Sequence, residues 1–496
     1  MALTQFAESF SLFSQVDVQE ALADAQLLGS KHHAAFVFPP AVSTLRQVRP
    51  PATEGEAAAL SRFVGELQSS GHVVQPCGSV PGLPDCWVIH PSHPHPAQRD
   101  GMAFAPCAKA ADDGTEDGPP EDSAAVVVDV GCGEAVLRGS DVFAPGIVAF
   151  SKDFKEGDPV RIFVALPKGK GTSLPFLKNT FLTDTELQTL CVQLSTKMPH
   201  ACAVASMART AVVRGEKGTA VRVMGSTGFG HPGLGNLAVP LPSLLFLQNH
   251  SSMVPAELLA PEPHHAVLDM CAAPGGKASH LLSAVSRTAR KRPGDQPLDT
   301  VLRHGGFSMT CCERSPSRAR QLRSLLELHH GAALVDGFVQ IVPKDVNKLT
   351  SVPTYDRILL DPPCSGTGLR PRLRPHDHTM DFITVAADYQ RKLLRSAAAM
   401  LKPTGRLTYS TCSLTVLENE GNVAWALAEG GLRVVASDTD HPIVVAFDRL
   451  ARRRHHFDSV PADHAAWCWT FGPKQSSTQP LLDSVGFFVA LLELAA

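Results

Sequence analysis

The chain has 496 residues and a mass of 52.9 kDa, with 45 lysines and arginines against 48 aspartates and glutamates. Its 44% hydrophobic and 19% charged residues are typical of a globular protein with room for about three domains. No apolar stretch approaches the roughly 18–20 residues of a membrane span, and acidic residues precede the first base, Lys31, so we expect no membrane partner and no secretory or mitochondrial leader.

The first 123 residues predict an α/β region. Apolar residues recur with helical spacing in residues 16–28 and in residues 57–67, so we expect a helix at each place. Residues 91–123 are rich in proline, glycine, alanine and acidic residues, which predicts a disordered acidic loop. Residues 112–122 carry six acidic and no basic side chains, and outside them basic residues outnumber acidic ones. A polyanionic partner is therefore allowed.

The twelve cysteines include no Cys-x-x-Cys pair, so we expect neither a zinc ribbon nor a disulfide framework. The group nearest to a metal site is Cys86 with His90, His93 and His95. Its spacing is irregular and it lies in a proline-rich segment, so we expect no metal there. Free thiols fit a reducing compartment, and we expect a cytoplasmic protein, with the nucleus as an alternative.

Residues 124–230 predict a small barrel or sandwich. Short β-rich runs recur about every ten residues and are separated by turns with glycine or charged residues. We expect strands over residues 126–130, 135–137, 146–150, 160–166 and 220–224. Basic side chains, among them Lys155, outnumber acidic ones here, which fits either a solvated surface or a face that binds phosphates.

From about residue 235 to the end, short apolar runs alternate with amphipathic stretches, which predicts a doubly wound, mostly parallel sheet. We expect strands over residues 266–270, 307–312, 339–342, 357–360 and 406–409, and helices over residues 277–286, 317–328, 386–401 and 417–429. Residues 484–492 are expected to add a final antiparallel strand. Ligands of such sheets bind beyond the carboxyl ends of the strands, so the segments that follow the strands are the candidate site.

A segment of small residues follows the first of these strands. Its two glycines before a predicted helix let backbone amides approach a ligand that carries a negative group. A phosphate-binding loop needs glycine at Cys271 and Ser or Thr at Ala278, so magnesium–nucleotide binding is poorly supported. A nucleoside with a carboxylate remains, and S-adenosylmethionine is its natural candidate. The residues expected to bind it here are Cys271, Ala272, Ala273, Pro274, Gly275, Gly276 and Lys277.

Two acidic residues follow the next two strands. We expect Glu313 to bind the ribose hydroxyls of the same ligand and Asp345 to reach its adenine amine. Either acid alone is better explained as surface charge. Their positions at successive strand ends favour the ligand role, because those ends meet at one edge of the sheet.

Two cysteines follow two further strands at the same edge. Cys364 lies just after Asp361 and two prolines, and Cys412 follows the strand over residues 406–409. A single cysteine after a strand is usually an inert core thiol, whereas two of them beside an acid fit a reaction that needs two thiols. Methylation of cytosine at C5 is such a reaction, because a thiolate that adds to C6 makes C5 nucleophilic. An acid at N3 and the exocyclic amine stabilises the adduct, and a base then removes the C5 proton so that the thiol leaves.

These segments resemble the signature of the Nop/Sun family of RNA cytosine-5 methyltransferases, and so does the Glu-Asn-Glu run at residues 418–420. The similarity covers residues 235–496. Residues 135–147, with a Leu-Arg-Gly and an Ala-Pro-Gly run, resemble a PUA domain, which is a small RNA-binding β-barrel. The resemblance implies a Rossmann-like class I methyltransferase core over residues 235–496 and a PUA domain over residues 124–230.

The resemblance also implies roles for single residues. Cys412 would be the nucleophile, and Cys364 would assist release of the methylated base. Asp361 would bind N3 of cytosine and contact the cofactor, and Lys277 would contact the target nucleotide or orient Asp361. Arg138, in the Leu-Arg-Gly run, would meet RNA. The family implies a tRNA substrate, methylated in the acceptor stem near the CCA end, and similar sites in mRNA.

Three further arginines follow Cys364, namely Arg370, Arg372 and Arg374, and they fit either contacts to RNA phosphates or a solvated loop. Pro362 stands where the family usually has alanine, and Ala278 where it usually has Thr or Ser, but neither change removes a reactive group. We expect a monomer that needs no metal. An rRNA substrate is one alternative, because the core alone does not select the RNA, and an inactive RNA-binding scaffold is another.

Overall fold

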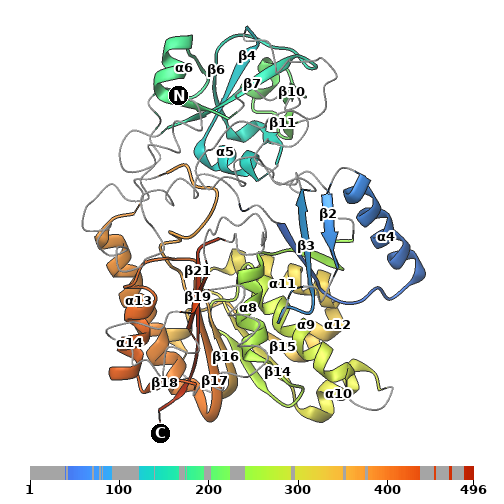
Figure 1. The fold of residues 1–496 in the computed structure, drawn as a ribbon, viewed down its shortest axis with the longest axis vertical. Coiled ribbons are helices and arrows are strands. Elements are labelled where there is room, and N and C mark those ends of the chain that lie inside the picture. The colour runs from blue at the N-terminus through green and yellow to red at the C-terminus, as the bar shows by residue number, and fades with distance from the viewer. Residues whose placement is uncertain are drawn as a thin grey trace.

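Three β-sheets make up the described part of the molecule (Figure 1). The computed structural model describes residues 40, 43–69, 72–76, 80, 82–91, 122–138, 140–166, 174, 176–194, 203–223, 241–291, 296–349, 354–374, 378–435, 452–453, 468–471 and 485–495. The helix expected over residues 16–28 and most of the acidic loop lie outside these ranges, as do His93 and His95. Within these ranges, no helix combines the length and the apolar character that a bilayer span requires.

The first sheet is antiparallel and joins two distant parts of the chain in the order β12-β1-β3-β2. Its strands are β1 (Ser43–Gln47), β2 (His72–Gln75), β3 (Cys86–Pro91) and β12 (Leu245–Leu247). Helix α4 (Glu54–Ser69) covers the helix expected over residues 57–67 and buries Phe63 and Leu67 against this sheet. The prediction of an α/β N-terminal region is therefore confirmed.

The second sheet has the order β5-β11-β10-β7-β4-β6-β8, with β9 paired to β7. Its strands are β4 (Ala124–Val128), β5 (Val142–Phe143), β6 (Ile147–Phe150), β7 (Pro159–Ala165), β8 (Thr180–Phe181), β9 (Cys191–Gln193), β10 (Ala203–Ala205) and β11 (Thr219–Val223). The helices around it are α5 (Val130–Leu137), η3 (Ala144–Gly146), α6 (Asp184–Leu190) and α7 (Arg209–Val213). Among the described residues these pairings do not close into a ring, so the barrel stays a prediction.

The strand expected over residues 135–137 is wrong, because these residues end helix α5. Asp129 caps this helix, and its side chain accepts a hydrogen bond from the Cys132 backbone N–H at 2.8 Å. Gly133, which the sequence suggested as a turn residue, lies against β7, where a Cβ atom would be 2.3 Å from Cγ2 of Val164. This glycine therefore serves close packing of a helix on the sheet rather than a turn.

The third sheet has nine strands in the order β15-β14-β13-β16-β17-β21-β20-β19, with β18 paired to β21. Parallel pairing joins β13 (Ala266–Asp269), β14 (Ser308–Cys312), β15 (Val339–Val342), β16 (Tyr355–Leu360) and β17 (Leu401–Thr411). Antiparallel pairing adds β18 (Leu432–Val434), β19 (Arg452–Arg453), β20 (Cys468–Phe471) and β21 (Phe487–Leu494). The doubly wound sheet and its antiparallel last strand are confirmed.

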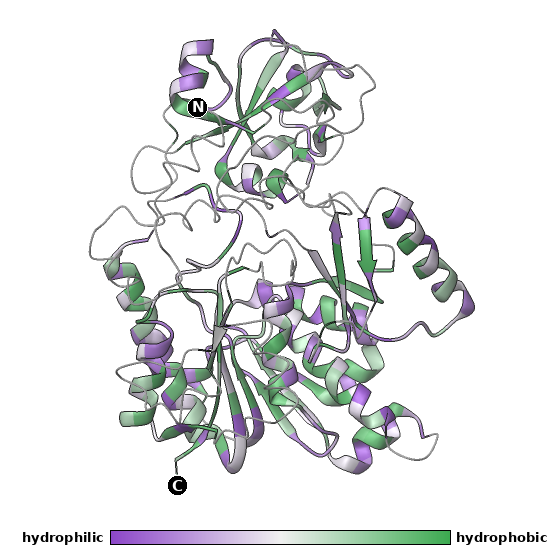
Figure 2. Ribbon diagram, viewed as in Figure 1, coloured by the Kyte–Doolittle hydropathy of each residue, from purple (hydrophilic) through white to green (hydrophobic). Residues whose placement is uncertain are grey.

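Helices cover the third sheet from two sides (Figure 1). One group comprises α8 (His250–Leu259), α9 (Gly276–Arg290), α10 (Leu298–Gly305), α11 (Pro316–His330) and α12 (Ala332–Phe338). The other comprises α13 (Met380–Met400) and α14 (Glu420–Ala428), with the short η4 (Val346–Lys348) after β15. Hydrophobic and hydrophilic residues alternate along these helices (Figure 2), as expected of helices with one buried face.

The second sheet and the third sheet share a hydrophobic core. Leu373, Ile383 and Leu414 are buried in the same apolar cluster as strands β4 and β7. The Leu373 N–H also donates to a carboxylate oxygen of Glu134, in α5, at 2.9 Å. These residues follow the two cysteines of the candidate site, so the second sheet packs directly against the segments that carry them.

Gly368→Ala is expected to destabilise the protein, because a Cβ atom there would lie 2.2 Å from the carbonyl oxygen of Gly486. The Gly368 N–H donates to the Cys412 carbonyl at 2.9 Å. Relief of the clash would therefore have to move backbone that is already hydrogen-bonded. We expect the free energy of unfolding to fall by about 1–3 kcal/mol in urea denaturation. Gly65→Ala, in α4 with open space around it, is the control. Its free energy of unfolding should rise by about 0.5–1 kcal/mol, because alanine favours a helix over glycine. Unchanged stability of the Gly368 variant would contradict the close approach.

Candidate active site

The loop after β13 forms one wall of a cleft. Residues 271–277 line it together with residues 246–249 and the carboxylates of Asp269 and Asp361, and its volume is about 250 Å³. Gly275 has φ +118°, in the region that favours glycine, and a Cβ atom there would be 2.9 Å from the Leu325 side chain. The loop therefore runs close to α11 before α9 begins at Gly276. All seven residues of the predicted cofactor loop line this cleft.

Asp269 ends β13 and is almost completely buried in the cleft wall. Its Oδ1 accepts from the Cys271 N–H at 3.3 Å, whereas its Oδ2 is buried and has no hydrogen-bond partner among the described residues. Burial raises the pKa of Asp269 to about 7, and the nearby charges of Asp361 and Glu313 add to this effect. A buried acceptor without a partner is unfavourable, and a cationic or hydrogen-bonding ligand would satisfy it.

The two predicted cofactor acids lie beyond β14 and β15, as expected, but neither is among the described residues that line the cleft. Glu313 is buried and accepts from the Ser315 N–H at 2.8 Å. Asp345 caps η4 and accepts a hydrogen bond from the Tyr389 hydroxyl at 3.1 Å. Both acids thus have structural partners at the same sheet edge, and their contacts to a ligand stay predictions.

Asp361 is held by two hydrogen bonds from different elements. Lys277, in α9, approaches its Oδ2 at 2.8 Å, and the Ser410 hydroxyl, in β17, donates to its Oδ1 at 2.9 Å. The Lys277 ammonium also lies 5.2 Å from the centre of the Phe487 ring. The carboxylate is therefore fixed in orientation at the point where β13, β16 and β17 end, which agrees with the expectation that Lys277 orients Asp361.

The two predicted thiols are in direct contact. The sulfur atoms of Cys364 and Cys412 lie 3.2 Å apart, within hydrogen-bond distance for sulfur. The hydrogen bond to Cys412, together with burial, raises the pKa of Cys364 well above its usual value. The same bond lowers the pKa of Cys412, and the Lys277 charge acts in the same direction. Cys364 therefore keeps the proton, and Cys412 is the better nucleophile of the pair.

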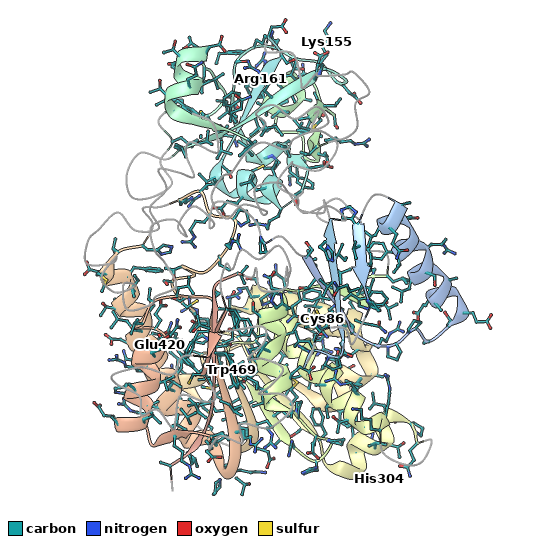
Figure 3. All side chains as sticks on the ribbon, viewed as in Figure 1. Cys86, Lys155, Arg161, His304, Glu420 and Trp469 are labelled. Carbon is teal, nitrogen blue, oxygen red and sulfur yellow. The ribbon has the colours of Figure 1, made fainter. Side chains whose placement is uncertain are left out.

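The three residues predicted to bind RNA lie apart from one another. Arg138 is exposed at the end of α5, which is on the side of the second sheet that faces the third sheet (Figure 1). Lys155 is exposed at the far end of the second sheet (Figure 3). Arg370 is only 7% exposed, which does not favour a contact to RNA phosphates, since its guanidinium is enclosed by protein. RNA binding by these residues stays a prediction.

Several residues around the site were not predicted from the sequence. Asp269 had a detectable signal, since it is an acid at a strand end. Ser410 had little signal, because serine is common in loops. Arg46, from β1, had none: it is completely buried and donates to the hydroxyls of Ser279 and Ser283 at 2.9 and 2.8 Å. Burial lowers the pKa of Arg46 to about 9. The first sheet thus supports helix α9 behind the cofactor loop.

Comparisons with known proteins match both halves of the chain. Residues 256–295 and 308–455 match the family described as 16S rRNA methyltransferase RsmB/F, and residues 124–171 match the PUA domain. The mouse protein named tRNA (cytosine(72)-C(5))-methyltransferase NSUN6 is 34% identical over 61% of this chain and 58% of its own length. The Arabidopsis thaliana protein named rRNA (cytosine-C(5))-methyltransferase NOP2C is 26% identical over 87% of this chain and 82% of its own length.

The fold also matches a solved structure, that of NSun6 from Pyrococcus horikoshii with SFG. The TM-score is 0.65 at 22% identity, and the match covers 97% of this chain and 98% of that one. It supports the fold expected from the sequence, a methyltransferase core joined to a PUA domain. The chain spans less than two thirds of the mouse and human NSUN6 relatives, at 58% and 59% of their lengths.

Asp269→Asn is expected to change how stability depends on pH. The folded-state pKa of Asp269 is about 7, above its usual value of 3.8, so between about pH 4 and pH 7 the folded chain binds a proton that the unfolded chain has lost. The free energy of unfolding therefore falls as pH rises through this window, by at most about 1.4 kcal/mol per pH unit. Because asparagine does not ionise, the variant lacks this decrease. Its free energy of unfolding should therefore rise relative to that of the parent between pH 5 and pH 7.

Urea denaturation without cofactor at several pH values measures this difference. Glu216→Gln removes an exposed carboxylate and is the control. A stability difference between the Asp269 variant and the parent that is constant from pH 5 to pH 7 would contradict a buried, protonated Asp269.

Proposed function

We propose that this protein methylates C5 of a cytosine in RNA, since residues 256–295 and 308–455 match the RsmB/F methyltransferase family and residues 124–171 match the PUA domain. The methyl donor is S-adenosylmethionine, and the substrate is tRNA. The observation that carries the proposal is the pair of thiols 3.2 Å apart, with the lower pKa on Cys412, beside a carboxylate that is fixed by Lys277 and Ser410. A reaction that needs a nucleophilic thiolate, a protonated thiol and an oriented acid matches this arrangement.

The cleft suits S-adenosylmethionine chemically. Its loop offers backbone groups of small residues, and Asp269 offers a buried oxygen without a partner among the described residues, which fits the ligand's ammonium group. Glu313 would accept from the ribose hydroxyls and Asp345 from the adenine amine. When bound, S-adenosylmethionine supplies an electrophilic methyl group. The solved relative from Pyrococcus horikoshii, which contains SFG, supports a cofactor site in this fold.

The chain's own residues divide the work on the base. Cys412, as thiolate, adds to C6 of the cytosine, which makes C5 nucleophilic. One oxygen of Asp361 shares a proton with N3, so that N3 is protonated as the electron pair moves onto it, and the other accepts a hydrogen bond from the exocyclic amine. Lys277 keeps this carboxyl group in place. After C5 has been methylated, its proton must leave so that Cys412 is expelled. Water takes this proton, the electron pair of the C–H bond forms the C5–C6 double bond, and Cys412 leaves as a thiolate. Cys364, which keeps its own proton and is in contact with Cys412, assists the release by donating a hydrogen bond to the departing sulfur.

A tRNA substrate is supported by the NSUN6 relatives, whose names give cytosine 72 of tRNA as their target. The target base must leave its stack to reach Cys412, at a cost of a few kcal/mol that is smallest near a helix end. The PUA domain packs against the thiol-bearing segments, so RNA bound to it would lie close to the site. The NOP2C relative matches more of the chain and supports rRNA as the second candidate substrate. An inactive RNA-binding scaffold has no use for the thiol pair.

The proposal extends to a cytoplasmic monomer that works without a metal. None of the described cysteines forms a disulfide, which fits a reducing compartment. Cys86 and His90 belong to the group at which the sequence predicts no metal. Both lie in β3, and the Cys86 thiol is buried. Size-exclusion chromatography with light scattering tests whether the protein is a monomer. Methylation in the presence of a chelator tests whether it needs a metal.

Cys412→Ala is expected to abolish methylation, since Cys412 is the proposed nucleophile and the raised pKa of Cys364 keeps the neighbouring thiol protonated. Purified protein is incubated with S-adenosylmethionine and either unmodified tRNA or rRNA, and bisulfite sequencing locates 5-methylcytosine. The parent should mark one cytosine in tRNA, and the variant should lower the rate by at least about a thousandfold. Cys132→Ala, in α5, is the matched control and should retain the mark. RNA binding without any mark from the parent would contradict the enzyme and favour the scaffold, and a mark in rRNA alone would favour the second substrate.

Cys364→Ala is expected to trap the protein on its RNA. Attack by Cys412 remains available, but release of the methylated base is slowed, so a covalent adduct accumulates. Denaturing gel electrophoresis with labelled tRNA and S-adenosylmethionine detects it as a band of reduced mobility. The adduct should be absent from the Cys364→Ala, Cys412→Ala double variant. Normal turnover by Cys364→Ala would show that this division of labour between the thiols is wrong.

A further inference from the structure

We propose that Glu418 is a positioning residue for the thiol pair, because its carboxylate binds both of the segments that carry Cys364 and Cys412. Its importance for methyl transfer rests on the proposed function. The geometry of the thiols, however, can be tested without RNA or cofactor. Glu418 lies in the loop between β17 and α14 and does not line the cofactor cleft among the described residues.

The Glu418 carboxylate accepts five hydrogen bonds. Its Oε1 accepts from the Ser365 backbone N–H at 2.7 Å and from the Gln390 side-chain amide at 3.1 Å. Its Oε2 accepts from the hydroxyls of Ser365 at 2.5 Å, Ser413 at 2.6 Å and Thr415 at 2.7 Å. One side chain thus joins the loop after β16, the loop after β17 and helix α13.

Two of these donors are chain neighbours of the reactive residues. Ser365 directly follows Cys364, and Ser413 directly follows Cys412. The two serine hydroxyls are also 3.0 Å from each other. Because each serine is joined to its cysteine by one peptide bond, a bridge between the serines restrains the distance between the sulfurs. That distance matters, since a misplacement of about 1 Å at a reacting group costs on the order of a hundredfold in rate.

The charge of Glu418 has a second effect. The side chain is completely buried, and every donor to it among the described residues is neutral. A buried carboxylate is costly unless it is fully hydrogen-bonded, so this group is retained at a place where an apolar residue would fold more easily. Its negative charge raises the pKa of both thiols, and for Cys364 it adds to the effects of Cys412 and burial. The unequal acidity of the thiols therefore depends on the sulfur–sulfur contact that Glu418 keeps in place, and not on its charge.

Glu418→Gln tests the proposal, because glutamine keeps the shape but removes the charge and one acceptor oxygen. Alkylation by iodoacetamide, followed by mass spectrometry of the peptides that contain each cysteine, reports the reactivity of the two thiols as pH is varied. In the parent, Cys412 should react at neutral pH and Cys364 only at higher pH. In the variant, the ratio of Cys412 to Cys364 alkylation at pH 7 should fall by about tenfold, because a weaker bridge between the two segments loosens the sulfur–sulfur contact that makes the thiols unequal.

Methylation kinetics supply the second measurement. The kcat of Glu418→Gln should fall by about 10- to 100-fold, with KM for tRNA changed by less than about threefold, because Glu418 does not reach the RNA. Glu429→Gln makes the same chemical change at the exposed end of α14 and should leave both measurements unchanged. A Glu418 variant that is merely less heat-stable, with a parental alkylation ratio and kcat, would overturn the proposal.

Ser413→Ala keeps the inference testable where Glu418→Gln does not fold. It removes one donor and leaves the charge, so the alkylation ratio should fall by about threefold, and an unchanged ratio would overturn the proposal. The alkylation experiment needs no substrate. If the alkylation ratio shifts but the parent methylates no RNA, the proposed function is contradicted and the positioning role of Glu418 is supported. If the parent methylates RNA but the ratio does not shift, the positioning role is contradicted and the proposed function is supported.

Discussion

The contact between two sulfur atoms is the interaction on which the account of this protein depends. A thiol and a thiolate 3.2 Å apart stabilise each other, because the protonated sulfur donates to the charged one. The bond makes two chemically identical side chains unequal, since it lowers the pKa of Cys412 and raises that of Cys364. Lys277 adds to this asymmetry because its charge lowers the pKa of Cys412, whereas Glu418 holds the two segments that carry the thiols together. In the proposed reaction, Cys412 would attack the base and Cys364 would donate a hydrogen bond to the departing sulfur.

The parallel sheet creates that contact from distant parts of the chain. β16 and β17 are neighbours and end at the same edge, so residues 48 positions apart are brought together. The same edge receives Lys277 from the start of α9, which bonds to Asp361 across 84 positions. The second sheet shares its apolar core with residues of the same segments. The second sheet and the segments that carry the thiols are therefore parts of one packed structure.

The sequence predicted those parts whose signals are local. Apolar runs and helical spacing were sufficient for the five parallel strands and the last strand of the third sheet, but not for β18, β19 and β20. Small residues after a strand were sufficient for the loop that lines the cleft. The strand expected over residues 135–137 failed because the capping role of Asp129 was overlooked and the glycines that follow were interpreted as turn residues. Glu418 belongs to the Glu-Asn-Glu run of the family signature, but the contacts of Arg46 and Glu418 could not be predicted, because their partners lie in other elements and only the fold brings them together. The burial of Arg370 could not be predicted from the sequence for the same reason.

The central claim is that Cys412 attacks the base while Cys364, in contact with it, does not. A tRNA that carries 5-fluorocytidine at the modified position tests it most directly, because fluorine at C5 cannot leave as a proton and the attacking sulfur stays bonded to C6. Protease digestion and mass spectrometry of the trapped complex then identify the cysteine. The account predicts that the nucleotide is bonded to the peptide that contains Cys412. A nucleotide bonded to Cys364, or no adduct under conditions that methylate unmodified tRNA, would contradict it.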